Sequence, residues 1–215
     1  MRYPLLVITD RSQARRPLPE IVEAVLYGGC RWISLRERDL PKPEQWALVD
    51  LLLPLVRRYD ALLTLHGNAQ TGKRGDIDGV HLSSSSNASA ARALVGPDRL
   101  VGMSVHSPAG AAAIDARMVD YVIAGPFHET QSKPGYEPAL GKAGLAAIVR
   151  ASPVPVVALG GIDVGNLADA VAAGAAGIAV MGGVMRADDP AQEVRGLLEA
   201  LGRARDHRAR YVPTP

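Results

Sequence analysis

Two pairs of glycines stand at corresponding places near the end of the chain. One pair follows the apolar run 154–159 and the other follows 176–181, and each precedes a helical segment. Short runs rich in valine and isoleucine are typical of strands buried on both faces. Backbone N–H groups at glycine-rich turns and helix N-termini bind phosphate oxygens, so the sequence predicts a phosphate site. The predicted site comprises Gly160, Gly161, Met181, Gly182 and Gly183.

Two arginines flank a glutamate in Arg36-Glu37-Arg38, directly after another apolar run. Each guanidinium is a planar fork that suits a phosphate or a carboxylate. The alternative interpretation is an exposed, ion-paired charge run. Lys133, in an irregular segment with several prolines, is a further candidate to hold an anion, although a loop lysine is often only solvated.

Four of the five histidines lie at or after the carboxyl ends of predicted strands, and His128 is the strongest candidate for chemistry. Imidazole, with an ordinary pKa of ~6.5, can both take and give a proton near neutral pH. His128 lies in the irregular segment 125–139, which we interpret as a lid; a surface-loop histidine is the alternative. His81 and His106 are expected to be hydrogen-bonded core residues. Further candidate binding residues are His66, Asn68, Ser104 and Thr130.

Strand-like and helical segments alternate along the chain, which predicts a parallel α/β fold. The expected strands are 5–9, 32–36, 61–65, 78–82, 100–104, 121–124 and the two glycine-ended runs. The expected helices are 17–27, 43–58, 88–95, 108–117, 144–150, 164–173 and 190–205. Eight regular units, without a dinucleotide fingerprint after the first strand, favour a (β/α)8 TIM barrel over an open sheet. In such a barrel the candidate residues, at the carboxyl ends of strands, share one face.

Composition limits the class of protein. A chain of 215 residues that is 47% hydrophobic suits one domain, which we assign to 1–205 with a tail at 206–215. A net charge of +2 and 4% aromatic residues give no sign of nucleic-acid binding. The single Cys30 fits a reducing compartment, and the apolar N-terminus is too short for a signal peptide or membrane span. We therefore expect a cytoplasmic protein.

Eight short motifs, in unbroken order over residues 3–200, resemble the thiamine phosphate synthase and TenI superfamily. They are Thr9-Asp10, Leu35–Arg38, Asp78–Leu82, Val101–Ser107, Asp120–Val122, Gly125-Pro126 with Thr130 and Lys133, Val157–Ile162 and Gly177–Met181. The resemblance implies a (β/α)8 barrel. It also implies that Gly161, Gly182 and Gly183 bind the phosphate of a thiazole. In the synthase branch, Arg36, Arg38 and Lys133 would hold a pyrophosphate.

The resemblance fails at the two places where the synthase carries magnesium-binding aspartates. The position after the third strand reads His66-Gly67-Asn68, and the position after the fourth reads Ser83 to Ser86. Neutral hydroxyls do not replace the carboxylates on which magnesium relies. The TenI-type thiazole tautomerase, which needs no metal, resembles the chain at both places. That branch has its histidine directly after the lid glycine, where this chain has Pro126.

The sequence therefore predicts a thiazole tautomerase with no cofactor. His128 would carry the proton, and Arg36 and Arg38 would orient a substrate carboxylate. One alternative is a thiamine phosphate synthase with an altered magnesium site, and another is a non-catalytic module that binds a phosphorylated ligand. A third is a transition-metal site built from His66, His81 and His106. The expected partner is a thiazole phosphate, with no nucleic acid or membrane, and a homodimer is left open.

Overall fold

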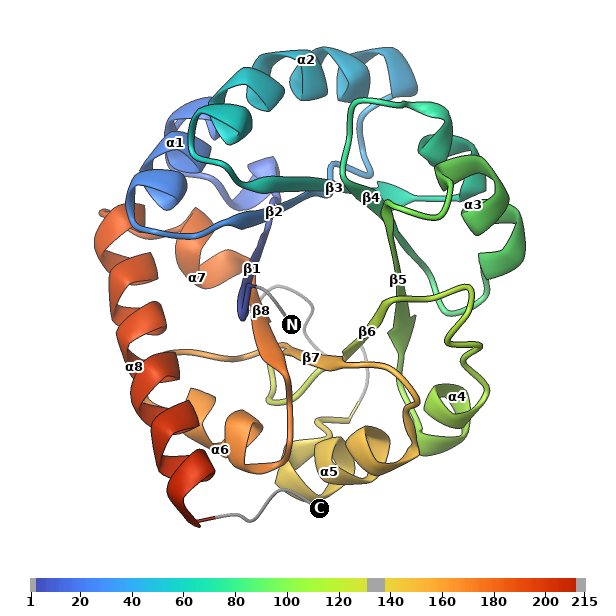
Figure 1. Ribbon diagram of the computed structural model, residues 1–215. Coiled ribbons are helices and arrows are strands. Elements are labelled where there is room, and N and C mark those ends of the chain that lie inside the picture. The colour runs from blue at the N-terminus through green and yellow to red at the C-terminus, as the bar shows by residue number, and fades with distance from the viewer. Residues whose placement is uncertain (1–2, 131–137, 212–215) are drawn as a thin grey trace.

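Eight parallel strands close into a barrel surrounded by helices, in the computed structural model that describes residues 3–130 and 138–211 (Figure 1). Each strand pairs with the next along the chain, and β8 pairs with β1. The predicted (β/α)8 barrel is confirmed. The strands are β1 (Leu5–Ile8), β2 (Trp32–Leu35), β3 (Leu62–Gly67), β4 (Gly79–Leu82), β5 (Leu100–Val105), β6 (Tyr121–Ala124), β7 (Val156–Leu159) and β8 (Gly177–Val180).

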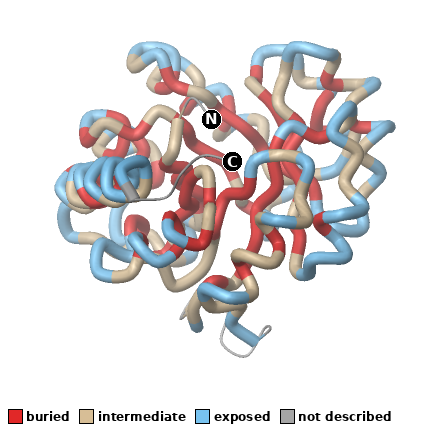
Figure 2. Tube along the Cα trace, turned by 60° about the horizontal axis from the view of Figure 1, so that its bottom comes forward, coloured by how far each residue is buried: buried red, intermediate tan, exposed pale blue. Residues whose placement is uncertain are grey.

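The strands are buried on both faces because the barrel separates two apolar layers. Side chains that point inward form a small core, to which Trp32 and Tyr121 contribute the largest rings, with centroids 4.8 Å apart. Side chains that point outward pack against the helices in a second, larger core. Figure 2 shows the buried strands running through the middle, with exposed stretches on the outer turns of the helices. This two-sided burial explains why the strand sequences are continuous apolar runs.

The helices lie outside the barrel and connect consecutive strands. They are α1 (Leu18–Tyr27), α2 (Lys42–Arg58), α3 (Ala88–Val95), α4 (Pro108–Ala112), α5 (Gly141–Ala151), α6 (Leu167–Ala172), α7 (Gly182–Met185) and α8 (Pro190–Tyr211). Two short 3-10 helices, η1 (Arg11–Gln13) and η2 (Ala69–Lys73), follow β1 and β3. No helix among the described residues is long and apolar enough to cross a membrane.

Two helices, α8 and α4, differ most in length from the sequence prediction. α8 continues to Tyr211, beyond the expected end at Arg205, so part of the predicted tail is helical; residues 212–215 lie outside the described ones. Arg208 and Arg210 in its last turn interact favourably with the helix dipole. α4 ends at Ala112 instead of Arg117, because the Asp115 carboxylate accepts a hydrogen bond from the Arg117 backbone and competes with the helix.

Gly102 lies where the inner core leaves no space for a side chain. A Cβ atom at Gly102 would come within 2.1 Å of Tyr121 Cζ, whereas one at the exposed Gly202 of α8 would meet nothing within 4 Å. We expect Gly102→Ala to lower the free energy of unfolding by about 1–3 kcal/mol through overpacking. The control Gly202→Ala should raise it by about 0.5–1 kcal/mol, as alanine favours a helix. Urea unfolding of both variants tests this; equal effects would contradict the packing described.

Candidate functional site

A cavity of about 500 Å³ opens at the carboxyl ends of β2, β3, β4 and β5. This is the end of a barrel at which active sites are built. The cavity contains three of the predicted site residues, Arg38, His66 and Ser104, together with His81. The remaining lining residues are Glu37, Leu40, Pro41, Lys42, Gln45, Gly67, Leu82 and Ser83.

His81, on β4, is buried at this end of the barrel. One ring nitrogen, Nε2, is hydrogen-bonded to Ser104 Oγ on β5 at 3.0 Å, and the His66 ring lies 4.6 Å away between centroids. Burial lowers the pKa of the His81 imidazole to about 3, and the positive charge of Arg38 acts in the same direction. Nδ1 has no hydrogen-bond partner among residues 3–130 and 138–211. His81 is thus the bonded core histidine that the sequence predicted, but it also contributes a neutral polar ring to the cavity.

Glu37 and Arg38 follow β2 but have different surroundings. Glu37 is buried and accepts hydrogen bonds from Thr9 Oγ1 at 2.6 Å and from the Arg11 backbone N–H at 3.0 Å. Burial raises the pKa of the Glu37 carboxyl, although these two hydrogen bonds oppose the shift. Glu37 therefore links the end of β2 to the end of β1 through these hydrogen bonds. Arg38 is exposed, and within the described part of the chain no carboxylate pairs with it.

Lys42, at the start of α2, adds a second cation to the cavity. Its Nζ donates to Gln45 Oε1 at 3.0 Å. The amide nitrogen of Gln45 donates to the carbonyls of Glu37 and Leu40, at 2.9 and 2.8 Å. Gln45 therefore holds the segment that carries Arg38. Sequence reasoning missed Lys42 and Gln45, although their position just after the predicted Arg36–Arg38 site was a usable signal.

The first glycine pair is covered by the segment that follows β6. Gly160 and Gly161 have φ angles of 108° and 60°, which favour glycine. A Cβ at Gly161 would lie 2.4 Å from the Glu129 carbonyl oxygen, and one at Gly160 would lie 2.8 Å from Pro126 Cα. The Gly160 carbonyl also accepts a hydrogen bond from the His128 N–H at 3.0 Å. This pair therefore permits close packing of the end of β7 against the segment 126–129.

The second glycine pair is more open at Gly183, whereas Gly182 is buried. Gly182 and Gly183 form the first turn of α7, and a Cβ at Gly183 would meet nothing within 4 Å. The first backbone N–H groups of a helix have no partner within it. This geometry is compatible with the predicted phosphate contact at Met181, Gly182 and Gly183, which stays a prediction.

The structure places the other predicted residues away from the cavity lining. His128 packs edge-on against Phe127, with ring centroids 4.3 Å apart, and its buried Nε2 has no hydrogen-bond partner among the described residues. Asn68 instead caps η2 by accepting from the Gln70 N–H at 3.0 Å. Arg36 and Thr130 do not line the cavity at the ends of β2 to β5. Lys133 lies outside the described residues.

The proposed three-histidine metal site is wrong. His66 and His81 are neighbours, but His106 Nδ1 is hydrogen-bonded to the Gly125 carbonyl at 2.9 Å. Within residues 3–130 and 138–211, no three His, Cys, Asp or Glu side chains are grouped as metal ligands. His106 is directed towards the carbonyl that follows β6, on the side of β5 away from β4, so it is not grouped with His66 and His81.

A magnesium site also does not fit these residues. Ser83 Oγ, after β4, is hydrogen-bonded to Ser86 Oγ at 2.9 Å, and Asn68 is engaged in its cap. These are neutral groups, whereas magnesium is bound through carboxylates and phosphates. The donor set at this end of the barrel therefore differs from the one that the family resemblance implies.

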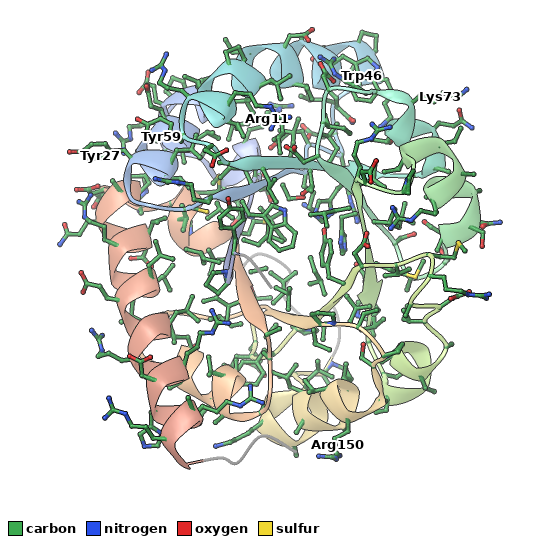
Figure 3. The ribbon with its side chains drawn as sticks, viewed as in Figure 1. Arg11, Tyr27, Trp46, Tyr59, Lys73 and Arg150 are labelled. Atoms are coloured by element: carbon green, nitrogen blue, oxygen red, sulfur yellow. The ribbon has the colours of Figure 1, made fainter. Side chains whose placement is uncertain are left out.

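A second hollow, of about 520 Å³, lies on the outer surface between α2 and η2. Trp46 and Lys73, which border it, stand at the periphery of the molecule in Figure 3. Arg74, also in the lining, pairs with Asp50 and with Asp76, the latter at 2.8 Å. Its charge is neutralised, so the barrel-end cavity is the better candidate site.

Comparison with known proteins identifies the family. The profile described as "Thiamine monophosphate synthase" matches residues 5–184. The chain belongs to the thiamine monophosphate synthase family. A putative thiamine-phosphate synthase of Geobacter sulfurreducens is 40% identical over 201 residues, covering 93% of this chain and 94% of that protein. A thiamine-phosphate synthase of Roseiflexus sp. is 39% identical over 207 residues, covering 95% and 87%.

The solved structures agree with the sequence relatives. A thiamine phosphate pyrophosphorylase from Pyrococcus furiosus superposes with a TM-score of 0.83 at 31% identity, covering 94% of this chain and 97% of that one. The resemblance to the superfamily is thereby confirmed. The names of these relatives support the synthase alternative rather than the predicted isomerase.

The lowered pKa of His81 has a consequence for stability. In the unfolded chain this imidazole takes up a proton below pH ~6.5, whereas in the folded protein it stays neutral to about pH 3. The contribution of neutral His81 to the free energy of unfolding is therefore fully present above the unfolded pKa. It falls as the pH drops below that value, by up to about 1.4 kcal/mol per pH unit. We expect His81→Gln to flatten the dependence of unfolding free energy between pH 6.5 and 5, measured in urea at several pH values. His207→Gln, at an exposed position, should keep the wild-type slope. A wild-type slope in His81→Gln as well would contradict a buried neutral ring at His81.

Proposed function

We propose that this protein is a thiamine phosphate synthase-type enzyme of thiamine biosynthesis. In this reaction the ring nitrogen of a thiazole phosphate attacks the methylene carbon of a pyrimidine diphosphate. The new carbon–nitrogen bond forms as the carbon–oxygen bond to the diphosphate breaks, and pyrophosphate leaves with the electron pair. The proposal rests on family membership together with the cavity at the carboxyl ends of β2 to β5.

The observation that carries the proposal is the environment of Arg38. Its guanidinium lines a cavity that also contains the hydrogen-bonded pair His81 and Ser104, which is polar but uncharged. No carboxylate in the described part of the chain neutralises this cation. A diphosphate offers oxygen pairs that match the guanidinium fork, so this cavity suits a diphosphate group.

Each residue would have a separate role. Arg38 and Lys42 would stabilise the negative charge that develops on the departing pyrophosphate, and electrostatic stabilisation of this kind is usually the largest single contribution to catalysis. Gln45 would act as a positioning residue, since it holds the segment 37–40. The N–H groups of Gly182 and Gly183 would bind the thiazole phosphate.

Replacing Arg38 tests this assignment. A charged hydrogen bond contributes about 1.5–3 kcal/mol, so Arg38→Gln should lower kcat/KM at least about tenfold. Arg150→Gln is the matched control, because Arg150 lies on the outer edge of α5 (Figure 3). The assay measures pyrophosphate release from thiazole phosphate and the pyrimidine diphosphate. Wild-type rates in Arg38→Gln, or no release by the wild-type protein, would contradict the proposal.

Thiazole tautomerisation is a second candidate, favoured by one observation. The buried Nε2 of His128 has no hydrogen-bond partner among the described residues, and His128 lies against Gly161 beside the barrel end. An imidazole in this setting could move a proton between a ring carbon and an exocyclic carbon.

The two candidates predict different effects of His128→Ala. A tautomerase should lose about 100-fold or more in turnover, because general acid–base catalysis contributes 10²–10⁴-fold. Exchange of the ring proton of a thiazole phosphate into heavy water, followed by NMR, measures this activity. Exchange that is equally fast in the variant would exclude His128 as the proton carrier. Binding of the thiazole phosphate with neither exchange nor pyrophosphate release would indicate a non-catalytic module.

A further inference from the structure

We infer that the cavity at the ends of β2 to β5 binds a diphosphate group directly, without a bridging divalent metal ion. The inference deepens the proposed function, on which it rests for the identity of the ligand. It follows from three features: a closed position at the end of β3, a carboxylate that is already engaged, and a neutral hydroxyl group beside cations that pair with no carboxylate in the described part of the chain.

The position after β3 has no room for an acidic side chain. At Gly67 a Cβ atom would lie 2.1 Å from Thr71 Oγ1 and 2.9 Å from Thr71 Cβ. Thr71 is buried in η2, so its side chain has little freedom to move away. The packing of η2 against the end of β3 therefore excludes a carboxylate here, and its absence is a property of the fold as well as of the sequence.

Glu37, the acidic residue in the cavity lining, is not available to a cation. Glu37 accepts from Thr9 Oγ1 and the Arg11 N–H, and Arg11 Nε lies 3.9 Å from its Oε2. Asp39, two residues on, pairs with the Arg11 guanidinium. A divalent ion would have to displace these contacts, because magnesium needs oxygen ligands in an octahedral arrangement.

Charge balance explains how such a cavity can still bind a diphosphate. Two aspartates and one Mg²⁺ carry a net charge of zero, and the neutral groups that occupy the corresponding positions here also sum to zero. The net field of Arg38 and Lys42 on the ligand is thus retained. Loss of the two carboxylates alone would leave the excess positive charge of the metal ion in the site. Loss of the metal ion alone would leave two carboxylates that repel the diphosphate.

The serines after β4 supply hydrogen-bond donors in this arrangement. Ser83 lines the cavity, and its Oγ is hydrogen-bonded to Ser86 Oγ at 2.9 Å and to Ser85 Oγ at 3.3 Å. A hydroxyl can rotate to donate to an anion, whereas a carboxylate accepts only. Ser83 would therefore offer a donor to a diphosphate, and Ser85 and Ser86 support its hydroxyl. An acidic side chain in its place would need a metal ion between its oxygens and those of the ligand.

Titration calorimetry with inorganic pyrophosphate tests the inference on the full chain. We expect the dissociation constant in excess EDTA to lie within about threefold of the value in Mg²⁺, after correction for the magnesium complex in solution. In EDTA, Arg38→Gln should weaken binding about tenfold, as expected for loss of a charged fork, and Arg150→Gln should not. Binding that tightens tenfold or more with Mg²⁺, or no binding in EDTA, would overturn the inference.

A carboxylate placed at Ser83 tests whether the diphosphate lies in direct contact with this serine. Ser83→Asp should weaken pyrophosphate binding in EDTA several-fold, because Ser83 lines the cavity and a like charge then faces the anion. Circular dichroism and the unfolding midpoint confirm that the variant is folded. Unchanged affinity in folded Ser83→Asp would place the ligand away from Ser83 and overturn its role.

Binding and activity can fail separately. Metal-free pyrophosphate binding without synthesis would leave the inference intact and reject the proposed function. Synthesis accompanied by magnesium-dependent pyrophosphate binding would support the proposed function and reject the inference.

Discussion

The pairing of β8 with β1 is the constraint on which the rest of the structure depends. Three residue pairs join these strands, and closing the barrel brings the carboxyl ends of all strands to one rim. Residues that are far apart in the sequence, such as Arg38, His81 and Ser104, thereby line one cavity. The inner core around Trp32 and Tyr121 fills the barrel below them, so the cavity has a solid floor rather than a channel.

Packing at this rim decides which polar groups remain available for a ligand. Thr71 closes the space at Gly67, and the segment after β6 covers Gly160 and Gly161. At Gly67 the glycine admits the Thr71 side chain, and at Gly160 and Gly161 it allows another stretch of backbone to approach closely. Where nothing approaches, as at Gly183, the same residue type leaves the backbone open. The glycines of the rim are therefore of two kinds, and only their neighbours in space distinguish them.

The sequence predicted the fold well because burial on both faces gives each strand a continuous apolar run. Its predictions for the site were less complete, for physical reasons. The Arg36-Glu37-Arg38 triplet contains three charges in a row, and only the contact of Glu37 with Thr9 and the Arg11 backbone shows that the carboxylate faces inward. Long-range pairings of this kind leave no periodic signal. The same holds for His81, whose strand position indicated a core residue but not that it borders a cavity.

The electrostatics of the cavity follow from the contrast between its floor and its rim. The floor is polar but neutral, because burial keeps the His81 imidazole uncharged, and the cations stand at the rim on Arg38 and Lys42. Exposed cations act on an approaching anion over about 8 Å at physiological ionic strength, since salt screens more distant charges. A bound diphosphate would lie between these cations and a floor of lower dielectric, where each contact is stronger than in water. Affinity in such a site depends on how far the ligand excludes water from the rim, and hence on Gln45, which fixes the segment that carries Arg38.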